Sequence, residues 1–319
     1  MRTQKFGDFD VSVIAFGSTH FGGNCAEGLA RELMDAYASL GGNFIDTARV
    51  YGDFKTPRNG ESEKVIGRWM ADRHCRERIF LSTKGGHPPL GQMGRSRLSR
   101  DEVRGDMAES LDALQTDHVD IYWLHRDDVN RPVGEIMETL QSLIDDGSAK
   151  MVGVSNWRPQ RIREALAYSK VHGLTPLSAN QPQFSLAVQA FFSDATLASM
   201  DREMYRMHRE THLACCCFSS QAHGFFTKLD EGGADCLPES LKKQYLCPEN
   251  LDIYARMKQL QKETGLDINV IALSFLTSQP FPTFALAGAS KIEHVYALKN
   301  ALDASLTPSQ RDSLRRFDE

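Results

Sequence analysis

Short apolar runs alternate along the chain with longer stretches in which apolar residues repeat every three or four positions. The short runs are rich in residues that favour strands, and the longer stretches have the periodicity of amphipathic helices. Eight runs have the length of a strand: residues 13–17, 43–47, 79–84, 119–125, 151–156, 178–183, 213–219 and 283–288. Helical spacing follows such runs, as at residues 29–40, 61–73, 100–114, 133–145, 158–172 and 270–278. This alternation is typical of repeated βα units around a parallel sheet.

Eight βα units predict an α/β fold of the (β/α)8 TIM-barrel class. A doubly wound sheet usually has fewer strands, and it is expected to show a glycine-rich dinucleotide turn after its first strand. The pair Gly22 and Gly23 has the wrong spacing for that turn. The barrel is therefore the favoured architecture.

Three segments depart from the repeat. Residues 1–11, with a Gly7-Asp8 pair between short alternating runs, predict a β-hairpin that plugs the bottom of the barrel. Residues 86–99 form a polar loop after the third strand, and residues 221–250 are expected to be a long irregular insertion after the seventh. Since no proline-rich or low-complexity linker separates two halves, residues 1–319 are interpreted as a single domain.

Composition narrows the class of protein. The 319 residues include 37 Lys and Arg against 42 Asp and Glu, a net charge of −5, and 41% are hydrophobic, which is ordinary for a globular chain. Without a strongly basic stretch, nucleic acid is not expected as a partner. No apolar run approaches the length of a membrane span, so no membrane association is expected.

The cysteines and the N-terminus bear on location. Cys215, Cys216 and Cys217 are consecutive, and neighbours on a strand point to opposite faces, which suits neither a disulfide framework nor a zinc site. The seven cysteines are also odd in number, so they cannot all form disulfides. For both reasons we expect reduced, mostly buried thiols. The polar start of the chain shows no secretory signal, so a cytoplasmic location is predicted.

Ionisable residues stand at the C-terminal ends of the predicted strands, where the working residues of such barrels lie. Asp46 ends the second strand and Tyr51 follows it, Lys84 ends the third, and His125 ends the fourth. Neighbouring strands are about 4.8 Å apart, so these side chains can converge.

This cluster suits proton transfer to a carbonyl oxygen. A phenol, with a reference pKa of about 10, is a poor proton donor at neutral pH, but a neighbouring ammonium stabilises the phenolate. Lys84 can be that neighbour of Tyr51, and Asp46 can hold the ammonium in place. His125 can donate to the same oxygen and orient it. Hydride transfer to a carbonyl requires this protonation.

These residues, in this order, resemble the tetrad of the aldo-keto reductase family, and the resemblance covers essentially the whole chain. It implies a nicotinamide cofactor. The segment GVSNW implies that Ser155 and Asn156 bind the nicotinamide carboxamide, and NQPQF implies the same of Gln181. FSSQAHGFF implies that Phe218 stacks on the nicotinamide, in the place of a more usual Tyr. Further cofactor contacts are expected there from Ser219, Ser220 and Gln221.

The segment AGASKIEHV resembles the family segment that holds the 2′-phosphate of NADPH. The residues implied are Gly288, Ala289, Ser290, Lys291 and His294. His294 stands where many relatives have an Arg, and Leu298 where many have an Asn that meets the adenine. NADPH is therefore the expected cofactor, with NADH as the alternative.

The resemblance implies an NAD(P)H-dependent oxidoreductase that reduces an aldehyde or ketone to an alcohol, reversibly. The loops expected at the top face are rich in His, Arg and Asp, which favours a polar small-molecule substrate such as a sugar or hydroxy-ketone. Candidate residues in these loops are His20, Phe54, His87, Arg126, Asp127 and Trp157. The alternative for Phe54 and Trp157 is surface packing, and the alternative for Arg126 and Asp127 is an ion pair at the rim.

Two other functions stay open. One is a cofactor-binding regulatory subunit resembling the potassium-channel β-subunits. The other is a sugar isomerase or lyase that retains its nicotinamide cofactor. Net consumption of NAD(P)H with an aldehyde separates the reductase from both.

Overall fold

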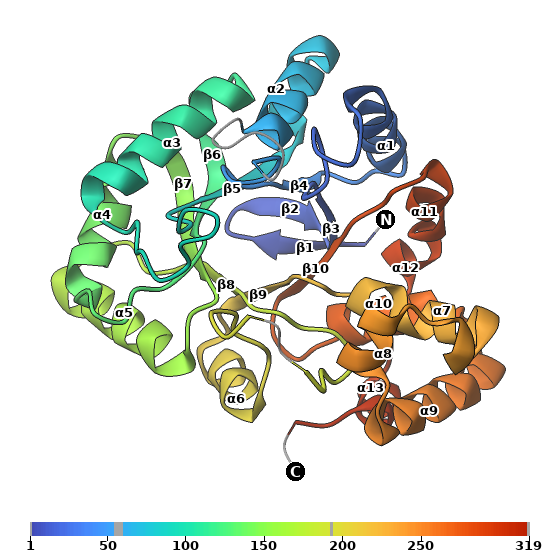
Figure 1. Ribbon diagram of the computed structural model, residues 1–319. Coiled ribbons are helices and arrows are strands. Elements are labelled where there is room, and N and C mark those ends of the chain that lie inside the picture. Colours follow the sequence, from blue (N-terminus) through green and yellow to red (C-terminus); the bar gives the residue numbers. More distant parts are fainter. Residues whose placement is uncertain (1, 54–59, 192–193, 318–319) are drawn as a thin grey trace.

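The computed structural model describes residues 2–53, 60–191 and 194–317. In these ranges eight parallel strands close into a barrel, in the order β10-β3-β4-β5-β6-β7-β8-β9 (Figure 1). The strands are β3 Ile14–Gly17, β4 Phe44–Asp46, β5 Phe80–Gly85, β6 Val119–Leu124, β7 Ala149–Ser155, β8 Ala179–Gln181, β9 Ala214–Cys217 and β10 Thr283–Ala287. The predicted TIM barrel is confirmed.

Helices surround the barrel. They are α1 Glu27–Ser39, α2 Glu61–Arg73, α3 Arg100–Leu114, α4 Val133–Asp145, α5 Pro159–His172, α6 Arg202–Thr211, α7 Phe225–Gly232, α8 Glu239–Tyr245, α9 Pro248–Thr264, α10 Ile268–Thr277, α11 Ile292–Ala297, α12 Lys299–Asp303 and α13 Pro308–Leu314. Side chains cap the N-termini of some of these helices. Ser99 accepts from the backbone N–H of Glu102 at the start of α3, and Thr307 and Gln310 form a capping box at the start of α13. No helix in the described ranges is long and apolar enough to cross a bilayer.

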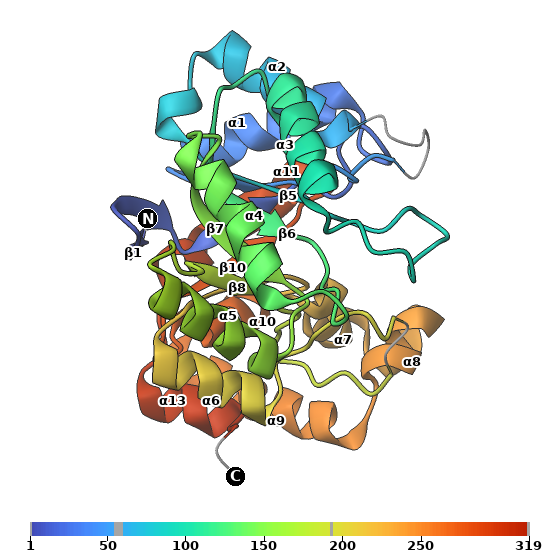
Figure 2. The same cartoon turned by 90° about the vertical axis from the view of Figure 1, so that its left-hand side faces the viewer.

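The N-terminal hairpin plugs one end of the barrel, as predicted. Its strands, β1 Thr3–Phe6 and β2 Phe9–Ser12, pair antiparallel around a turn at Gly7, whose φ is +57°. Phe6 lies inside the barrel, with ring centroids 4.9 Å from Phe284 and 5.1 Å from Phe80. Figure 2 shows the hairpin at the end opposite the 86–99 loop and α8. The strands' C-terminal ends are therefore left open for chemistry.

The barrel strands contribute to two apolar layers. An inner cluster fills the barrel, and an outer cluster lies between strands and helices. Cys216 belongs to the inner cluster, whereas Cys215 and Cys217 belong to the outer one. All three are buried free thiols, so they are part of the core. Burial raises the pKa of the thiols of Cys216 and Cys217 well above the ordinary value, which keeps them protonated and unreactive.

The prediction of an irregular insertion at residues 221–250 was wrong, because the segment contains α7 and α8. In α7 the buried residues Phe225, Phe226 and Leu229 lie on one face, and in α8 Leu241 and Tyr245 are four residues apart. These short apolar faces pack on the outer cluster. Glycines and prolines between them obscure the helical period, since each helix has only about two turns. The 86–99 loop, by contrast, has no helix or strand before Arg100.

Candidate active site

Neighbouring strands bring the four predicted catalytic residues together at the open end of the barrel. Asp46 is the last residue of β4, Lys84 lies near the end of β5, and His125 directly follows β6. Tyr51 stands in the loop after β4, and its ring centroid lies 5.8 Å from that of His125. The convergence expected from the sequence is therefore present in the structure.

Asp46 and Lys84 form a buried ion pair, with 2.6 Å between Nζ and Oδ2. Lys84 also donates to the carbonyl oxygen of Thr47 at 2.7 Å. The other oxygen of Asp46 accepts from Ser82 Oγ at 2.7 Å and from Gln181 Nε2 at 3.1 Å. Both charged side chains are about 1% exposed. Hydrogen bonds on both carboxylate oxygens hold the pair in one geometry, as a buried pair requires.

Tyr51 lies against the ammonium of this pair. Lys84 Nζ is 4.8 Å from the centroid of the phenol ring. Burial by itself lowers the pKa of Lys84, but Asp46 and Tyr51 outweigh it and raise that pKa above its ordinary value. Lys84 is therefore a permanent cation beside the Tyr51 hydroxyl. A cation there favours the phenolate left after proton donation.

His125 is a neutral imidazole. Burial holds its pKa well below the ordinary value, with smaller contributions from repulsion by a proton on His87 and by the charges of Lys84 and Arg126. Nδ1 is buried and has no hydrogen-bond partner among the described residues. Nε2 is thus the nitrogen available to a substrate, and a proton on it makes His125 a donor.

The three predicted carboxamide-binding residues lie together at the ends of β7 and β8. Ser155 Oγ donates to the carbonyl oxygen of Gln181 at 2.8 Å. Asn156 donates to the carbonyl oxygen of His125 at 3.1 Å, and its own Oδ1 accepts from the backbone N–H of Ala198. Asn156 has φ +64°, a left-handed conformation that Asn tolerates. Gln181 links this group to the carboxylate of Asp46 through Nε2, while its Oε1 accepts no hydrogen bond from the described residues.

The segment after β9 continues around the same mouth. The ring of Phe218 is half-buried against the inner cluster. Ser219 has a left-handed φ of +52°, and Ser220 Oγ donates to the carbonyl oxygen of Leu286 at 2.6 Å. Gln221 donates to Asn269 at 2.5 Å. Of these residues, Ser220 and Gln221 line a narrow cavity together with residues 185–187.

The predicted 2′-phosphate residues form a separate, exposed group after β10. Gly288, Ser290, Lys291 and His294 are exposed, and Ala289 is half-buried. Within the group, Ser290 Oγ and His294 Nδ1 are 3.3 Å apart. Leu298, in contrast, is buried in the outer cluster, so its side chain faces the core.

Arg126 and Asp127 do not form the rim ion pair that was the alternative for them. Arg126 lies 3.6 Å from Asp194, and Asp127 pairs with Arg161 at 3.2 Å. The two residues are adjacent in the chain but belong to different networks. Trp157 is buried and donates to the carbonyl oxygen of Arg126, so it packs behind the mouth. Phe54 lies outside the described residues.

Two contacts escaped prediction from the sequence. Ser82 supports Asp46, and the signal for it was its position two residues before Lys84, on the same face of β5. The ring of His87 lies 4.7 Å from that of His125, in a T-shaped arrangement. His87 was assigned to the top-face loops, but no local pattern indicated this contact.

Known proteins match the chain along most of its length. A model of the aldo/keto reductase family matches residues 13–319. An aryl-alcohol dehydrogenase of Pestalotiopsis microspora is 30% identical over 293 residues, which cover 89% of this chain and 71% of that protein. The chain belongs to the aldo-keto reductase family. The resemblance drawn from its motifs is thus confirmed.

Other relatives in the family carry different names. A norsolorinic acid reductase of Aspergillus flavus is 27% identical over 325 residues, which cover 97% of this chain and 77% of that protein. An aldo-keto reductase of Strobilurus tenacellus is 25% identical over 334 residues, which cover 100% of this chain and 92% of that protein. Membership makes the chain an oxidoreductase of the carbonyl-reducing aldo-keto reductase family, with a substrate of its own to be identified.

Proposed function

We propose that this aldo-keto reductase reduces small aldehydes or ketones to alcohols, reversibly, with NADPH as the preferred cofactor and NADH as the alternative. The observation that carries the proposal is the buried ammonium of Lys84, which pairs with the carboxylate of Asp46 on one side and lies 4.8 Å from the ring centroid of Tyr51 on the other. That arrangement suits protonation of an oxygen that gains charge.

The residues at the mouth fit a nicotinamide. The half-buried ring of Phe218 offers an apolar face, and the Gln181 Oε1 acceptor matches a carboxamide N–H. We assign Ser155 and Asn156 to the same group. Ser219, Ser220 and Gln221 would hold the diphosphate side, next to the narrow cavity that Ser220 and Gln221 line.

The exposed residues after β10 would hold the adenosine end. Ser290, Lys291 and His294 supply a hydroxyl, an ammonium and an imidazole, which suit a 2′-phosphate. Gly288 is exposed and Ala289 half-buried, and these small residues leave the backbone there accessible.

When bound, the reduced nicotinamide supplies a hydride to the carbonyl carbon. Tyr51 donates its hydroxyl proton to the carbonyl oxygen as negative charge develops there. Lys84 stabilises the phenolate that remains, and Asp46 keeps Lys84 aimed at it. His125, neutral and free at Nε2, donates to the same oxygen and fixes the direction of the carbonyl. In the reverse direction, the phenolate of Tyr51 accepts the proton of the alcohol.

A panel of aldehydes and ketones, assayed with NADPH and with NADH, tests the proposal. We expect one cofactor molecule oxidised for each alcohol formed, and faster turnover with NADPH. Cofactor binding without consumption on any member of the panel would contradict the proposal and favour a binding role. Product formation without net cofactor oxidation would favour an isomerase or lyase instead.

A further inference from the structure

A second imidazole stands beside the catalytic histidine. His87 follows β5 by two residues, and its ring centroid lies 4.7 Å from that of His125, with the rings at 68°. The side chain is half-buried, so part of it faces the open end of the barrel. The mechanism above assigns no role to His87.

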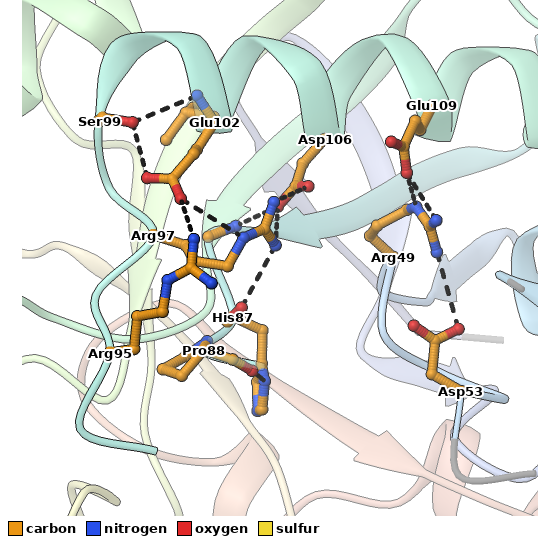
Figure 3. Close-up of polar contacts among 12 residues, drawn as sticks. Arg49, Asp53, His87, Pro88, Arg95, Arg97, Ser99, Glu102, Asp106 and Glu109 are labelled. Carbon is orange, nitrogen blue, oxygen red and sulfur yellow. Dashed lines mark hydrogen bonds and ion pairs between the residues drawn. The ribbon is translucent and has the colours of Figure 1, made fainter. Parts of the chain in front are cut away.

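The backbone of His87 is held from both sides by one buried ion pair (Figure 3). Asp106 accepts from the backbone N–H of Gly86 at 2.9 Å, and Arg97 donates to the carbonyl oxygen of His87 at 3.3 Å. Arg97 and Asp106 join through two hydrogen bonds of 2.6 and 3.0 Å. Their side chains are 13% and 1% exposed. A buried, bidentate pair fixes this part of the loop more firmly than its polar sequence indicates.

Glycine before His87 is required by the same turn. Gly86 has φ +69°, and a Cβ there would lie 2.5 Å from a methyl group of Leu98. The turn directs the chain from β5 across the mouth of the barrel. The position of His87 is therefore set by the fold as well as by the ion pair.

The hydrogen bond of His87 determines which of its nitrogens is free. Nδ1 lies 2.6 Å from the carbonyl oxygen of Pro88, and a carbonyl oxygen only accepts, so Nδ1 carries the proton. In the neutral ring Nε2 is then an acceptor. Nε2 has no hydrogen-bond partner among the described residues. Since it is also absent from the fully buried atoms without a partner, it is accessible at the mouth of the barrel.

His87 also keeps its acceptor at neutral pH. Burial, together with the nearby charges of Arg126 and Arg97, lowers its pKa below the ordinary value, although Asp194 and the Pro88 hydrogen bond act in the opposite direction. The neighbouring ring of His125 is neutral as well, so it places no additional charge beside His87. The mouth thus presents two imidazoles of opposite character, a donor at His125 and an acceptor at His87.

We propose that His87 is a specificity-determining residue, whose Nε2 accepts a hydrogen bond from a hydroxyl on the carbon next to the substrate carbonyl. With the carbonyl oxygen on His125 and Tyr51, a hydroxyl one carbon away comes within reach of the adjacent ring. The substrate class is then α-hydroxy aldehydes and α-hydroxy ketones. This inference rests on the proposed function, because it needs a carbonyl held at Tyr51.

Matched substrates test the proposal in the holoenzyme with NADPH. Lactaldehyde and propanal have the same carbon chain and differ by one hydroxyl. We expect kcat/KM to be about 10-fold higher for lactaldehyde, the value of one hydrogen bond in a partly desolvated site. The difference should lie mainly in KM, since the hydroxyl is bound equally before and during hydride transfer.

Two substitutions separate the acceptor from the shape of the side chain. His87→Leu should lower kcat/KM for lactaldehyde alone and so bring the ratio of kcat/KM for lactaldehyde and propanal close to one. His87→Gln keeps an acceptor near the position of Nε2, so it should retain much of the preference for lactaldehyde. His172→Leu is the matched control, because this exposed histidine stacks on Tyr168 at the end of α5. As a readout independent of turnover, propane-1,2-diol should inhibit the wild type more strongly than propan-1-ol, and His87→Leu should abolish that difference.

The outcomes distinguish this inference from the proposed function. Equal kcat/KM for the two aldehydes in the wild type would overturn the role of His87 and leave carbonyl reduction intact. An unchanged ratio in both His87 variants would do the same. If neither aldehyde nor any other carbonyl is reduced, the proposed function falls, and this inference falls with it.

Discussion

The residues at the C-terminal ends of β4 and β5 and those that follow β10 both present polar groups to the mouth of the barrel, but they are held differently. Asp46 and Lys84 are buried, 2.6 Å apart, and supported by Ser82 and Gln181. Ser290 and His294 are exposed and 3.3 Å apart. The first group is organised before any ligand arrives, whereas the second is free to adapt to one.

The two groups should therefore differ in how much they contribute to the stability of the fold. A buried ion pair persists only when its geometry is fixed on all sides, so loss of either partner is costly to the fold as well as to the chemistry. An exposed group is screened by water and salt, and each of its members contributes little. Substitutions should therefore affect turnover and stability at the first group, and only cofactor affinity at the second.

Lys84→Met should produce the largest effect. It removes the cation beside Tyr51 and leaves the buried Asp46 carboxylate unpaired, so we expect kcat to fall about 1,000-fold and the free energy of unfolding to fall by about 3–5 kcal/mol. Steady-state kinetics and urea unfolding measure the two losses.

A double variant separates the two losses. Asp46→Leu with Lys84→Met removes both charges, so it should recover much of the stability without any recovery of activity. A Lys84→Met protein as stable and as active as the wild type would show that the pair has neither role.

Glu63, like Asp46, is a fully buried carboxylate, but its hydrogen-bond partner is a neutral hydroxyl. It accepts from Thr83 at 2.5 Å, and burial raises its pKa from 4.5 to about 7, although the Thr83 hydrogen bond and the charge of Arg49 act against the shift. The folded state therefore keeps a proton that the unfolded state releases between pH 4.5 and 7. The free energy of unfolding should fall by roughly 3 kcal/mol as pH rises through that window, and change no further above it.

Glu63→Gln should remove most of that dependence, while Glu77→Gln, at an exposed position, should retain it. Thermal or urea unfolding between pH 4.5 and 8 measures the slopes. Identical slopes in the wild type and Glu63→Gln would mean that Glu63 is ionised in the folded protein throughout this range.

Lys291→Ala should produce the smallest effect. The ammonium is exposed, so its loss should raise the Kd for NADPH about 3- to 10-fold at low salt and less at high salt. The Kd for NADH should not change, because NADH lacks the 2′-phosphate. Lys299→Ala, at an exposed position on α12, is the control. An equal loss of affinity for both cofactors would place Lys291 away from the phosphate.

The spacing of apolar residues was sufficient to predict the bounds of the long, regular helices. The predicted spans for α2, α3 and α4 agree with the structure at both ends. Their apolar spacing runs through three or more turns, and Ser99 caps α3. The convergence of Asp46, Tyr51, Lys84 and His125 was also predictable, because adjacent parallel strands place their C-terminal residues side by side.

The remainder depends on contacts between distant residues. The helices α7 and α8 are short, and they are ordered by packing on the outer cluster. The position of His87 depends on Asp106, which is 19 residues further along the chain, and on the left-handed turn at Gly86. A one-dimensional pattern does not contain such contacts. The same reason explains why Arg126 pairs with Asp194 rather than with its neighbour in the chain.

In the proposed mechanism, Tyr51 is the proton donor. Tyr51→Phe removes only the hydroxyl, so turnover should fall about 1,000-fold, while the Kd for NADPH, measured by fluorescence titration, stays within about 2-fold of the wild type. Tyr296→Phe, at an exposed position on α11, should change neither quantity. A Tyr51→Phe enzyme that keeps most of its turnover would show that another group donates the proton and would contradict the account.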